Sequence, residues 1–233
     1  MIVVVTGASK GIGKAVVEKY AAEGHTLFIC ARNLGHLQDA ANEIAAKYPQ
    51  STIYTTAVDM GDKQQVVAFG HCVLTAAGRI DVLVNNAGQF LPGSIHTEDE
   101  GVLEKMITTN LYSAYHLTRV LLPTMMAAKN GHIFNICSIA SLQAYPNGGS
   151  YSISKFALAG FSKNLREELK PHNIKVTAVY PGAVYTDSWA GSGVDPNRIM
   201  QSDDVAELIY AASKLSAQAC VEEIVLRPQL GDL

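Results

Sequence analysis

The sequence predicts an α/β protein, a doubly wound sheet of seven parallel strands with helices on both faces. Short β-branched runs alternate with longer segments of helical periodicity along all 233 residues. The first run, Val3-Val4-Val5, is apolar at consecutive positions, as a strand covered by helices on both faces must be. A glycine-rich turn follows this run directly. These three observations together indicate a Rossmann fold.

The expected strands follow one another along the chain, and helical segments separate them. Their ranges are 2–6, 26–31, 52–58, 81–85, 132–137, 175–180 and 221–226. Apolar spacing places helices at about 13–23, 34–48 and 151–170, and Pro171 closes the last of these. Ligands of such sheets bind beyond the carboxyl ends of the strands, so we expect function in the loops that follow each strand.

Composition limits the class of protein. The 18 Lys and Arg residues against 21 Asp and Glu give a net charge of −3, which argues against a nucleic-acid partner. No stretch approaches the roughly 18 apolar residues of a membrane helix, and no signal-peptide pattern precedes Thr6. No linker or repeat divides the chain. We therefore expect residues 1–233 to form one domain of a cytoplasmic protein that has no membrane partner.

The cysteines and histidines point to neither a disulfide nor a metal. Cys30, Cys72, Cys137 and Cys220 lie far apart with no Cys-x-x-Cys pair, so we expect four buried, reduced thiols. The seven histidines form no His-Glu-x-x-His motif and pair with no cysteine cluster. We therefore expect no metal site.

The glycine-rich turn is Thr6-Gly7-Ala8-Ser9-Lys10-Gly11-Ile12-Gly13, between a strand and a helix. Glycines there allow positive φ and close backbone approach, while free N–H groups and the helix dipole face a pyrophosphate. An ATPase phosphate loop is the rival interpretation, but it requires Gly at position 8 and Ser or Thr at position 15, and both are Ala. The turn therefore favours a dinucleotide.

The residues after the second expected strand indicate which dinucleotide. An NAD enzyme usually has Asp or Glu there, whereas this chain reads Cys30-Ala31-Arg32-Asn33. Arg32 and Lys10 suit the 2′-phosphate of NADP(H), which a carboxylate would repel. The alternative is that Arg32 is a solvated charge at a helix start and Lys10 a loose surface lysine. We predict NADP(H) as the cofactor.

Tyr151 and Lys155 stand four residues apart at the start of an expected helix, so they share one face. A tyrosine titrates near pH 10, and lowering that pKa by about 3 units requires about 4 kcal/mol. We expect Lys155 and a nicotinamide cation to supply this stabilisation, which makes Tyr151 a general acid or base. Ser138 follows the strand 132–137, 13 residues before Tyr151.

Together these motifs resemble the short-chain dehydrogenase/reductase family over essentially the whole chain. The matching positions are Thr-Gly-x-x-x-Gly-x-Gly at 6–13, Asp59, Asn85-Asn86-Ala87-Gly88, Asn110, Ser138, Tyr151, Lys155, and Pro181-Gly182 with Thr186. The resemblance implies that Ser138 holds a carbonyl and that Tyr151 gives the proton. It further implies that Lys155 binds the nicotinamide ribose and that Asn110 supports a water-linked proton path. Asn85 is expected to brace its turn.

The same resemblance implies which residues touch NADP(H). They are Gly7, Ser9, Lys10, Gly11, Ile12, Gly13, Arg32, Asn33, Asp59, Met60, Asn86, Ala87, Gly88, Asn110, Tyr151, Lys155, Pro181, Gly182, Val184 and Thr186. Three of them keep a second interpretation. Asp59 is also a candidate helix N-cap before Asp62 and Gln65. Asn110 is a candidate for satisfying backbone groups at a helix bend, and Thr186 for a turn hydroxyl.

The segment at about 185–200 resembles the substrate loop of the family, and its glycines at 191 and 193 suit a closing lid. Trp189, Tyr145, Leu142 and Phe90 are expected either to line an aromatic pocket or to pack at the edge of the core. The stretches 181–186 and 221–228 and the ending at 231–233 are similar to those of bacterial sepiapterin-reductase-like members, and other carbonyl reductases have similar endings. This favours the side-chain ketone of a planar pterin.

The expected helices 110–129 and 151–170 carry small and apolar residues on more than one face. These are Ala114, Leu117, Leu121, Ala157, Ala159 and Phe161. In the family such helices pair between subunits, which implies a homodimer or homotetramer. The alternative is that these side chains only cover the sheet.

The first functional hypothesis is an NADP(H)-dependent oxidoreductase that moves a hydride between nicotinamide and a small-molecule ketone or aldehyde, or a secondary alcohol in reverse. A catalytically silent NADP-sensing protein is the alternative outside the enzymes. A 3-oxoacyl thioester reductase is the alternative within the class. A sugar-nucleotide epimerase shares Tyr-x-x-x-Lys, but that group generally carries an added C-terminal domain, for which 233 residues leave no room.

Overall fold

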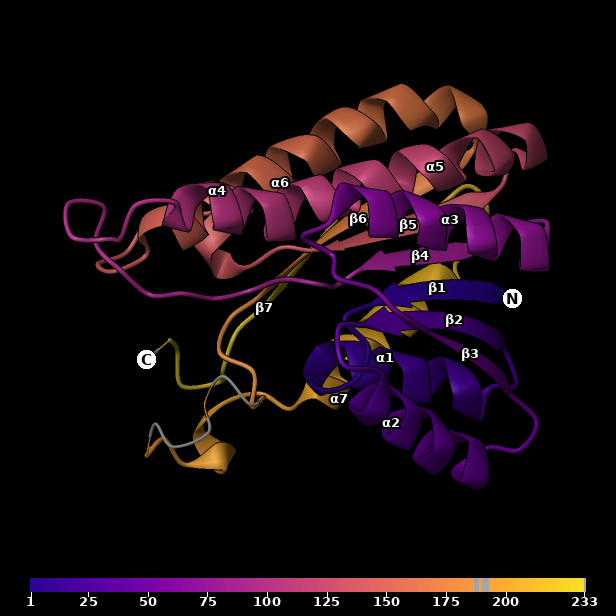
Figure 1. The fold of residues 1–233 in the computed structure, drawn as a ribbon, viewed down its shortest axis with the longest axis horizontal. Coiled ribbons are helices and arrows are strands. Elements are labelled where there is room, and N and C mark those ends of the chain that lie inside the picture. The colour runs from indigo at the N-terminus through magenta and orange to yellow at the C-terminus, as the bar shows by residue number, and fades with distance from the viewer. Residues whose placement is uncertain (187–188, 190–192, 233) are drawn as a thin grey trace.

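A computed structural model describes residues 1–186, 189 and 193–232. A sheet of seven parallel strands in the order β3-β2-β1-β4-β5-β6-β7 runs through its centre (Figure 1). The strands are β1 (Ile2–Thr6), β2 (Thr26–Ala31), β3 (Thr52–Ala57), β4 (Val82–Asn85), β5 (Gly131–Ile136), β6 (Ile174–Pro181) and β7 (Glu223–Leu226). Each neighbouring pair is parallel. The predicted fold class is confirmed.

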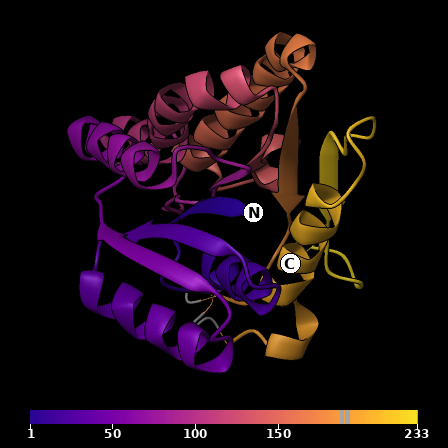
Figure 2. The same ribbon diagram turned by 90° about the vertical axis from the view of Figure 1, so that its right-hand side faces the viewer.

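Helices cover both faces of this sheet (Figures 1 and 2). One face carries α1 (Gly11–Ala22), α2 (Leu34–Lys47) and α7 (Ser202–Ser213). The other carries α3 (Lys63–Ala77), α4 (Val102–Ile107), α5 (Ser113–Ala128) and α6 (Gly149–Leu169). A π-helical turn, Thr108–Tyr112, joins α4 to α5, so the expected helix 110–129 is interrupted at its start.

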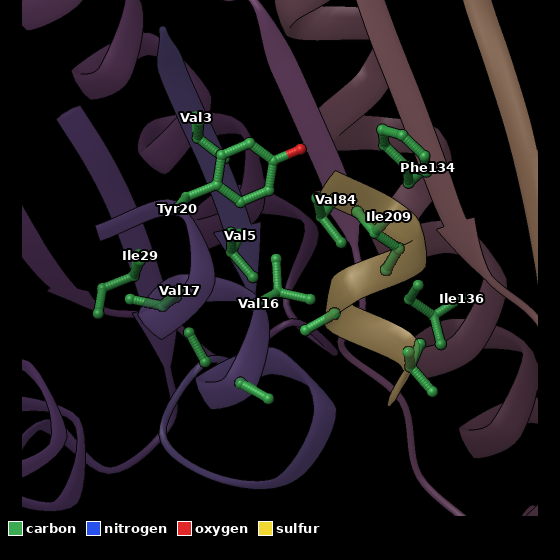
Figure 3. Close-up of a cluster of buried hydrophobic side chains, with 14 of the residues drawn as sticks. Val3, Val5, Val16, Val17, Tyr20, Ile29, Val84, Phe134, Ile136 and Ile209 are labelled. Carbon is green, nitrogen blue, oxygen red and sulfur yellow. The ribbon is translucent and has the colours of Figure 1, made fainter. Parts of the chain in front are cut away.

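The core lies in two layers, one on each face of the sheet, and the first strand supplies both. Val3 and Val5 pack beneath α1, where Tyr20 lies, and Ile209 of α7 packs in the same layer (Figure 3). Val4 packs in the opposite layer, among side chains of α3, α5 and α6. Because side chains alternate along a strand, a run of consecutive valines is what a strand covered on both faces requires.

Local sequence explains where α2 and α3 begin and where α3 ends. The Oδ1 atom of Asn33 accepts the His36 N–H at 3.0 Å and caps α2. The Oδ1 atom of Asp62 accepts the Gln64 N–H at 2.8 Å and caps α3, which ends at Gly78 in a left-handed conformation (φ +69°). The helix α6, which carries Tyr151 and Lys155, has Gly148 at its N-cap position and so has no local side chain to cap it.

Two predictions about burial need correction. Leu117 and Leu121 are fully buried within the core of their own chain, so they cover the sheet and do not face a partner subunit. Cys30 and Cys137 are buried as expected, but Cys72 is exposed and Cys220 is only partly covered. These two thiols lie at the surface of the fold, where the spacing of apolar residues does not predict which side chains are buried. All four cysteines are free.

Within the described part of the chain, no helix combines the length and the apolar character that crossing a membrane requires. Among the described residues there is also no group of three or more His, Cys, Asp or Glu side chains able to hold a metal ion.

Candidate active site

The glycine loop between β1 and α1 is shaped for close backbone approach. Gly7 and Gly11 have positive φ angles of +66° and +55°, which other residues rarely adopt. A Cβ atom at Gly13 would lie 2.3 Å from the Gly7 carbonyl oxygen and 2.5 Å from Asn86 Nδ2. Position 13 therefore has room for hydrogen alone. Ser9 and Lys10 form the turn, and the Ile12 side chain packs against the adjoining core layer.

The turn after β4 is bound directly to the glycine loop. Asn86 Nδ2 donates to the Thr6 carbonyl at 2.9 Å and to the Gly7 carbonyl at 3.0 Å. The Thr6 hydroxyl oxygen in return accepts the Asn86 and Ala87 N–H groups. Both Nδ2 donors of Asn86 are thus engaged with the loop, and Oδ1 is the atom of its amide left for a ligand contact.

Asn85 does not brace this turn, contrary to prediction. Its Nδ2 donates to Asn135 Oδ1 on β5 at 2.8 Å and to Thr118 Oγ1 on α5 at 3.1 Å. The reason is alternation along the strand, which directs neighbouring side chains to opposite sides. Asn85 therefore ties β4 to the elements beside it, and Asn86 ties it to the glycine loop.

The carboxyl ends of β2 and β3 carry the residues expected beside the adenosine half of the cofactor. Arg32 is exposed there, and the Ala8 N–H donates to the Cys30 carbonyl at 3.1 Å, which joins the glycine loop to the end of β2. Met60 is buried beside the Cys30 thiol. Asp59 Oδ1 accepts the Gly61 N–H, and Asp62 caps α3, so the N-cap interpretation of Asp59 was wrong.

Ser138 and Tyr151 meet at the carboxyl edge of β5. The Ser138 side chain accepts the Ala140 N–H at 3.1 Å and caps a short 3-10 turn, Ile139–Ser141, which holds its hydroxyl in place. Tyr151 lies in the first turn of α6. The Ser138 hydroxyl lies near enough to the Tyr151 phenol to act to lower its pKa. The structure therefore brings together two residues that are 13 positions apart in sequence.

Burial raises the pKa of the Tyr151 phenol above its ordinary value of 10, and the Ser138 hydroxyl opposes the rise only in part. The predicted lowering rests on a nicotinamide cation as well as on Lys155, so it stays a prediction for the protein with bound cofactor. Lys155 Nζ lies 5.8 Å from the centre of the Tyr151 ring.

Lys155 is a buried cation, 5% exposed. Its Nζ donates to the Ile136 carbonyl at 2.8 Å, and burial lowers the pKa of the ammonium to about 8. A Cβ atom at Gly88 would lie 3.5 Å from Lys155 Nζ and 3.2 Å from Asn110 Oδ1. Because Gly88 has no side chain, both Lys155 Nζ and Asn110 Oδ1 can lie close to the turn after β4.

Asn110 lies in the π-helical turn that precedes α5. Its Oδ1 accepts the Gln89 N–H at 2.7 Å, and its Nδ2 donates to the Gln89 carbonyl at 3.0 Å and to Ser154 Oγ at 2.8 Å. The interpretation that Asn110 satisfies backbone groups at a helix bend is confirmed. The same contacts join the loop after β4 to α6, one residue from Lys155.

The segment after β6 returns toward the glycine loop. Pro181 ends β6, and the Gly182 N–H donates to the Leu226 carbonyl at 2.7 Å. Val184 pairs with Met200 in an isolated parallel bridge. The Thr186 methyl carbon lies 3.0 Å from where a Cβ atom at Gly11 would be. Of the cofactor residues predicted on this segment, Thr186 therefore lies beside the glycine loop.

The expected substrate loop is described in part. Residues 187, 188 and 190–192, including the glycine at 191, lie outside the described residues. Phe90 packs edge-to-face on Tyr151, with ring centres 4.8 Å apart. Leu142 and Tyr145 are 43% and 39% exposed, so they are available to line a pocket at this edge.

The structure adds a contact that the sequence gave no reason to expect. The Glu98 carboxylate accepts the Ser150 N–H at 2.9 Å, across 52 residues of sequence. No motif marks Glu98, since it is one of three consecutive acidic residues in a polar loop. Only the folded chain distinguishes it from its neighbours.

The donor set fits a dinucleotide. Gly7, Gly11 and Gly13 form a cradle that a Cβ atom would fill, at the positive end of α1. Lys155 has three N–H donors, and the described residues supply a partner for one of them. A ribose diol placed beside Lys155 would satisfy the other donors.

A family model described as short chain dehydrogenase matches residues 1–196. The chain therefore belongs to the short-chain dehydrogenase/reductase family and is an oxidoreductase of that family. It is similar, with 32% identity over 241 residues, to a sepiapterin reductase from Chlorobaculum tepidum, and the match covers 100% of this chain and 98% of the relative.

Two solved structures are similar to this fold throughout. A metagenomic short-chain oxidoreductase in complex with NADP is 34% identical with a TM-score of 0.85, and the match covers 98% of this chain and 97% of the other. The L-sorbose reductase of Gluconobacter frateurii complexed with NADPH and L-sorbose is 27% identical with a TM-score of 0.89, over 97% of this chain and 94% of the other.

Proposed function

We propose that this protein is an NADP(H)-dependent carbonyl reductase in which residues 1–233 form one catalytic unit. It would transfer a hydride between nicotinamide and a ketone or aldehyde, or act on a secondary alcohol in reverse. The observation that carries the proposal is the convergence of Ser138, Tyr151 and Lys155 at one edge of the sheet, beside the glycine loop.

In reduction, the Ser138 hydroxyl holds the carbonyl oxygen, and Tyr151 Oη gives that oxygen its proton. The bound nicotinamide supplies the hydride. Burial keeps the pKa of Tyr151 above 10, so the phenol is protonated at neutral pH and suited to act as the acid. Lys155, with a pKa of about 8, is mostly charged at pH 7 and stabilises the phenolate that remains. Asn110 holds the loop after β4 against α6.

The choice of NADP(H) over NAD(H) is supported by Arg32, which is exposed at the end of β2 where an NAD enzyme would carry a carboxylate. Both solved relatives described above were determined with NADP or NADPH. Replacing Arg32 and Lys10 by Ala should raise the KM for NADPH far more than the KM for NADH. Arg79→Ala, just before the amino end of β4 and so on the far side from the strand ends that carry the site, is the control. Equal effects on both cofactors would refute the assignment.

The substrate class is tested by NADPH oxidation, followed by absorbance, with pterins that carry a side-chain ketone, diketones and acetoacetyl thioesters. The likeness to a sepiapterin reductase supports the pterins, and preference for the thioesters would favour a 3-oxoacyl reductase. Tyr151→Phe should lower kcat by about 10²–10⁴-fold wherever the wild type is active. If wild type and Tyr151→Phe are equally inert on every compound, the NADP-sensing alternative takes precedence.

A homodimer or homotetramer is also proposed. Although Leu117 and Leu121 are buried, apolar side chains remain exposed beside and along α6, with Tyr112 48%, Ile153 40% and Phe156 43% exposed. A patch of this kind favours burial between two copies of the chain. Light scattering at micromolar concentration tests the proposal, and a monomer would contradict it.

A further inference from the structure

The helix that carries Tyr151 and Lys155 receives its N-terminal cap from a distant part of the chain. The first N–H groups of any α-helix lack acceptors within the helix, and Gly148 offers no side chain to α6. The Glu98 carboxylate takes that place, accepting the N–H of Ser150 at 2.9 Å and also its hydroxyl. A carboxylate is favourable at this end of the helix dipole. Ser150 directly precedes Tyr151.

The surroundings are shaped around the Glu98 side chain. A Cβ atom at Gly149, whose φ is +34°, would lie 2.2 Å from Glu98 Oε1. A Cβ atom at Gly93 would lie 2.6 Å from Glu98 Cγ. Two glycines thus leave the room that this one side chain fills, which an incidental surface contact would not need.

The segment 89–98, called here the strap, is attached at both ends to the candidate active site. At one end Gln89 exchanges two backbone hydrogen bonds with the Asn110 side chain. At the other end Glu98 binds Ser150. Between them, Phe90 packs edge-to-face on the ring of Tyr151 at 4.8 Å and 81°. The strap therefore contacts the phenol ring and also holds the first turn of the helix that presents it.

We propose that Glu98 is a positioning residue for the reduction described above. Its carboxylate holds the first turn of α6 and the strap in one arrangement, and so sets the direction of the Tyr151 phenol toward Ser138. The inference rests on the proposed function. A displacement of about 1 Å at a reacting group can cost about 100-fold in rate, so a cap that fixes the residue next to Tyr151 has a direct route to kcat.

The contact itself is tested without turnover, by hydrogen exchange at the Ser150 amide in the NADPH-bound protein. Glu98→Ala should speed exchange of this amide at least tenfold. Glu98→Gln keeps an acceptor oxygen and should remain within about threefold of wild type. Glu100→Ala changes an exposed carboxylate two residues away and should leave exchange unaltered. Unchanged exchange in Glu98→Ala would overturn the proposal.

The consequence for catalysis is measured with a carbonyl compound that the wild type reduces. Glu98→Ala should lower kcat about 10- to 100-fold and leave the KM for NADPH within twofold, whereas Glu98→Gln restores most of kcat. A purely structural role would change both parameters or unfold the protein, which thermal melting detects. Wild-type kcat in Glu98→Ala, or the same loss in Glu100→Ala, would overturn the proposal.

A variant that fails to fold and a wild type that reduces no compound lead to different conclusions. If Glu98→Ala does not fold, Ser150→Ala serves instead, since it removes only the hydroxyl contact and should lower kcat by about threefold with unchanged KM for NADPH. An unchanged kcat there would count against the positioning role. If the wild type reduces no compound in the panel, the proposed function fails, while hydrogen exchange still decides whether Glu98 holds the start of α6.

Discussion

The buried ammonium of Lys155 should leave a measurable trace in the stability of the protein. Burial lowers its pKa from 10.5 to about 8, so the folded protein binds this proton less tightly than the unfolded chain. The resulting destabilisation is fully present below pH 8. It fades as the pH rises from 8 to 10.5, because the unfolded chain then loses the same proton.

The magnitude follows from the two pKa values. At pH 7 the penalty is about 3 kcal/mol, and at pH 10 it is about 1 kcal/mol. Lys155→Met keeps the length of the side chain and removes the charge. It also removes the hydrogen bond to the Ile136 carbonyl, a loss that depends only weakly on pH. The free energy of unfolding of Lys155→Met relative to wild type should therefore fall by roughly 2 kcal/mol between pH 7 and pH 10.

Urea unfolding followed by far-ultraviolet circular dichroism at pH 7, 8, 9 and 10, without added NADPH, measures this difference. Lys105→Met is the matched control, because Lys105 is exposed on α4 and its charge costs no desolvation. The control should show no such dependence on pH. A constant difference between Lys155→Met and wild type across the range would show that Lys155 titrates as an ordinary amine, and the reasoning would be refuted.

Three further predictions concern the glycine loop, the contact between α3 and α5, and the residues near 230. Gly13→Ala places a Cβ atom 2.3 Å from the Gly7 carbonyl oxygen and should weaken NADPH binding at least tenfold in a fluorescence titration; an unchanged Kd would contradict this. Gly70→Ala places one 2.6 Å from Val120 Cγ1 and should cost about 1–3 kcal/mol in urea unfolding, most of it regained by adding Val120→Ala. Arg198→Ala loses hydrogen bonds to three carbonyls of residues 230–232, so carboxypeptidase should digest the tail faster, and an unchanged rate would count against a bracing role.

The fold was predictable because its information is local. Val3, Val4 and Val5 mark a strand covered on both faces, and a glycine-rich turn directly after such a strand is typical of a Rossmann fold. Boundaries were less accurate at the last strand, expected from Val221. It begins at Glu223, which pairs with Ala178 of β6, because pairing with a neighbouring strand and not composition decides where a strand starts.

The structure brings Ser138, Tyr151 and Lys155 to one edge of the sheet, as predicted, whereas many individual contacts there could not be predicted. Asp59 and Asp62 are both plausible caps, and only the turn between them decides that Asp62 caps α3. Asn85 and Asn86 have identical side chains, yet strand alternation sends them to different partners. The pKa of Tyr151 depends on burial, which no spacing rule measures. Glu98 acts across 52 residues, beyond any local pattern.

The carboxyl edge of the sheet carries two features that stability alone would not favour. Lys155 is a buried cation, and among the described residues Asn85 Oδ1 is a buried oxygen with no hydrogen-bond partner. Each costs free energy that the two apolar layers around Val3 and Val4 must offset. Substitutions that remove these groups should therefore stabilise the protein, and under the proposed function the loss of Lys155 would also remove activity. The rest of the sheet acts as a scaffold that makes such a costly arrangement tolerable.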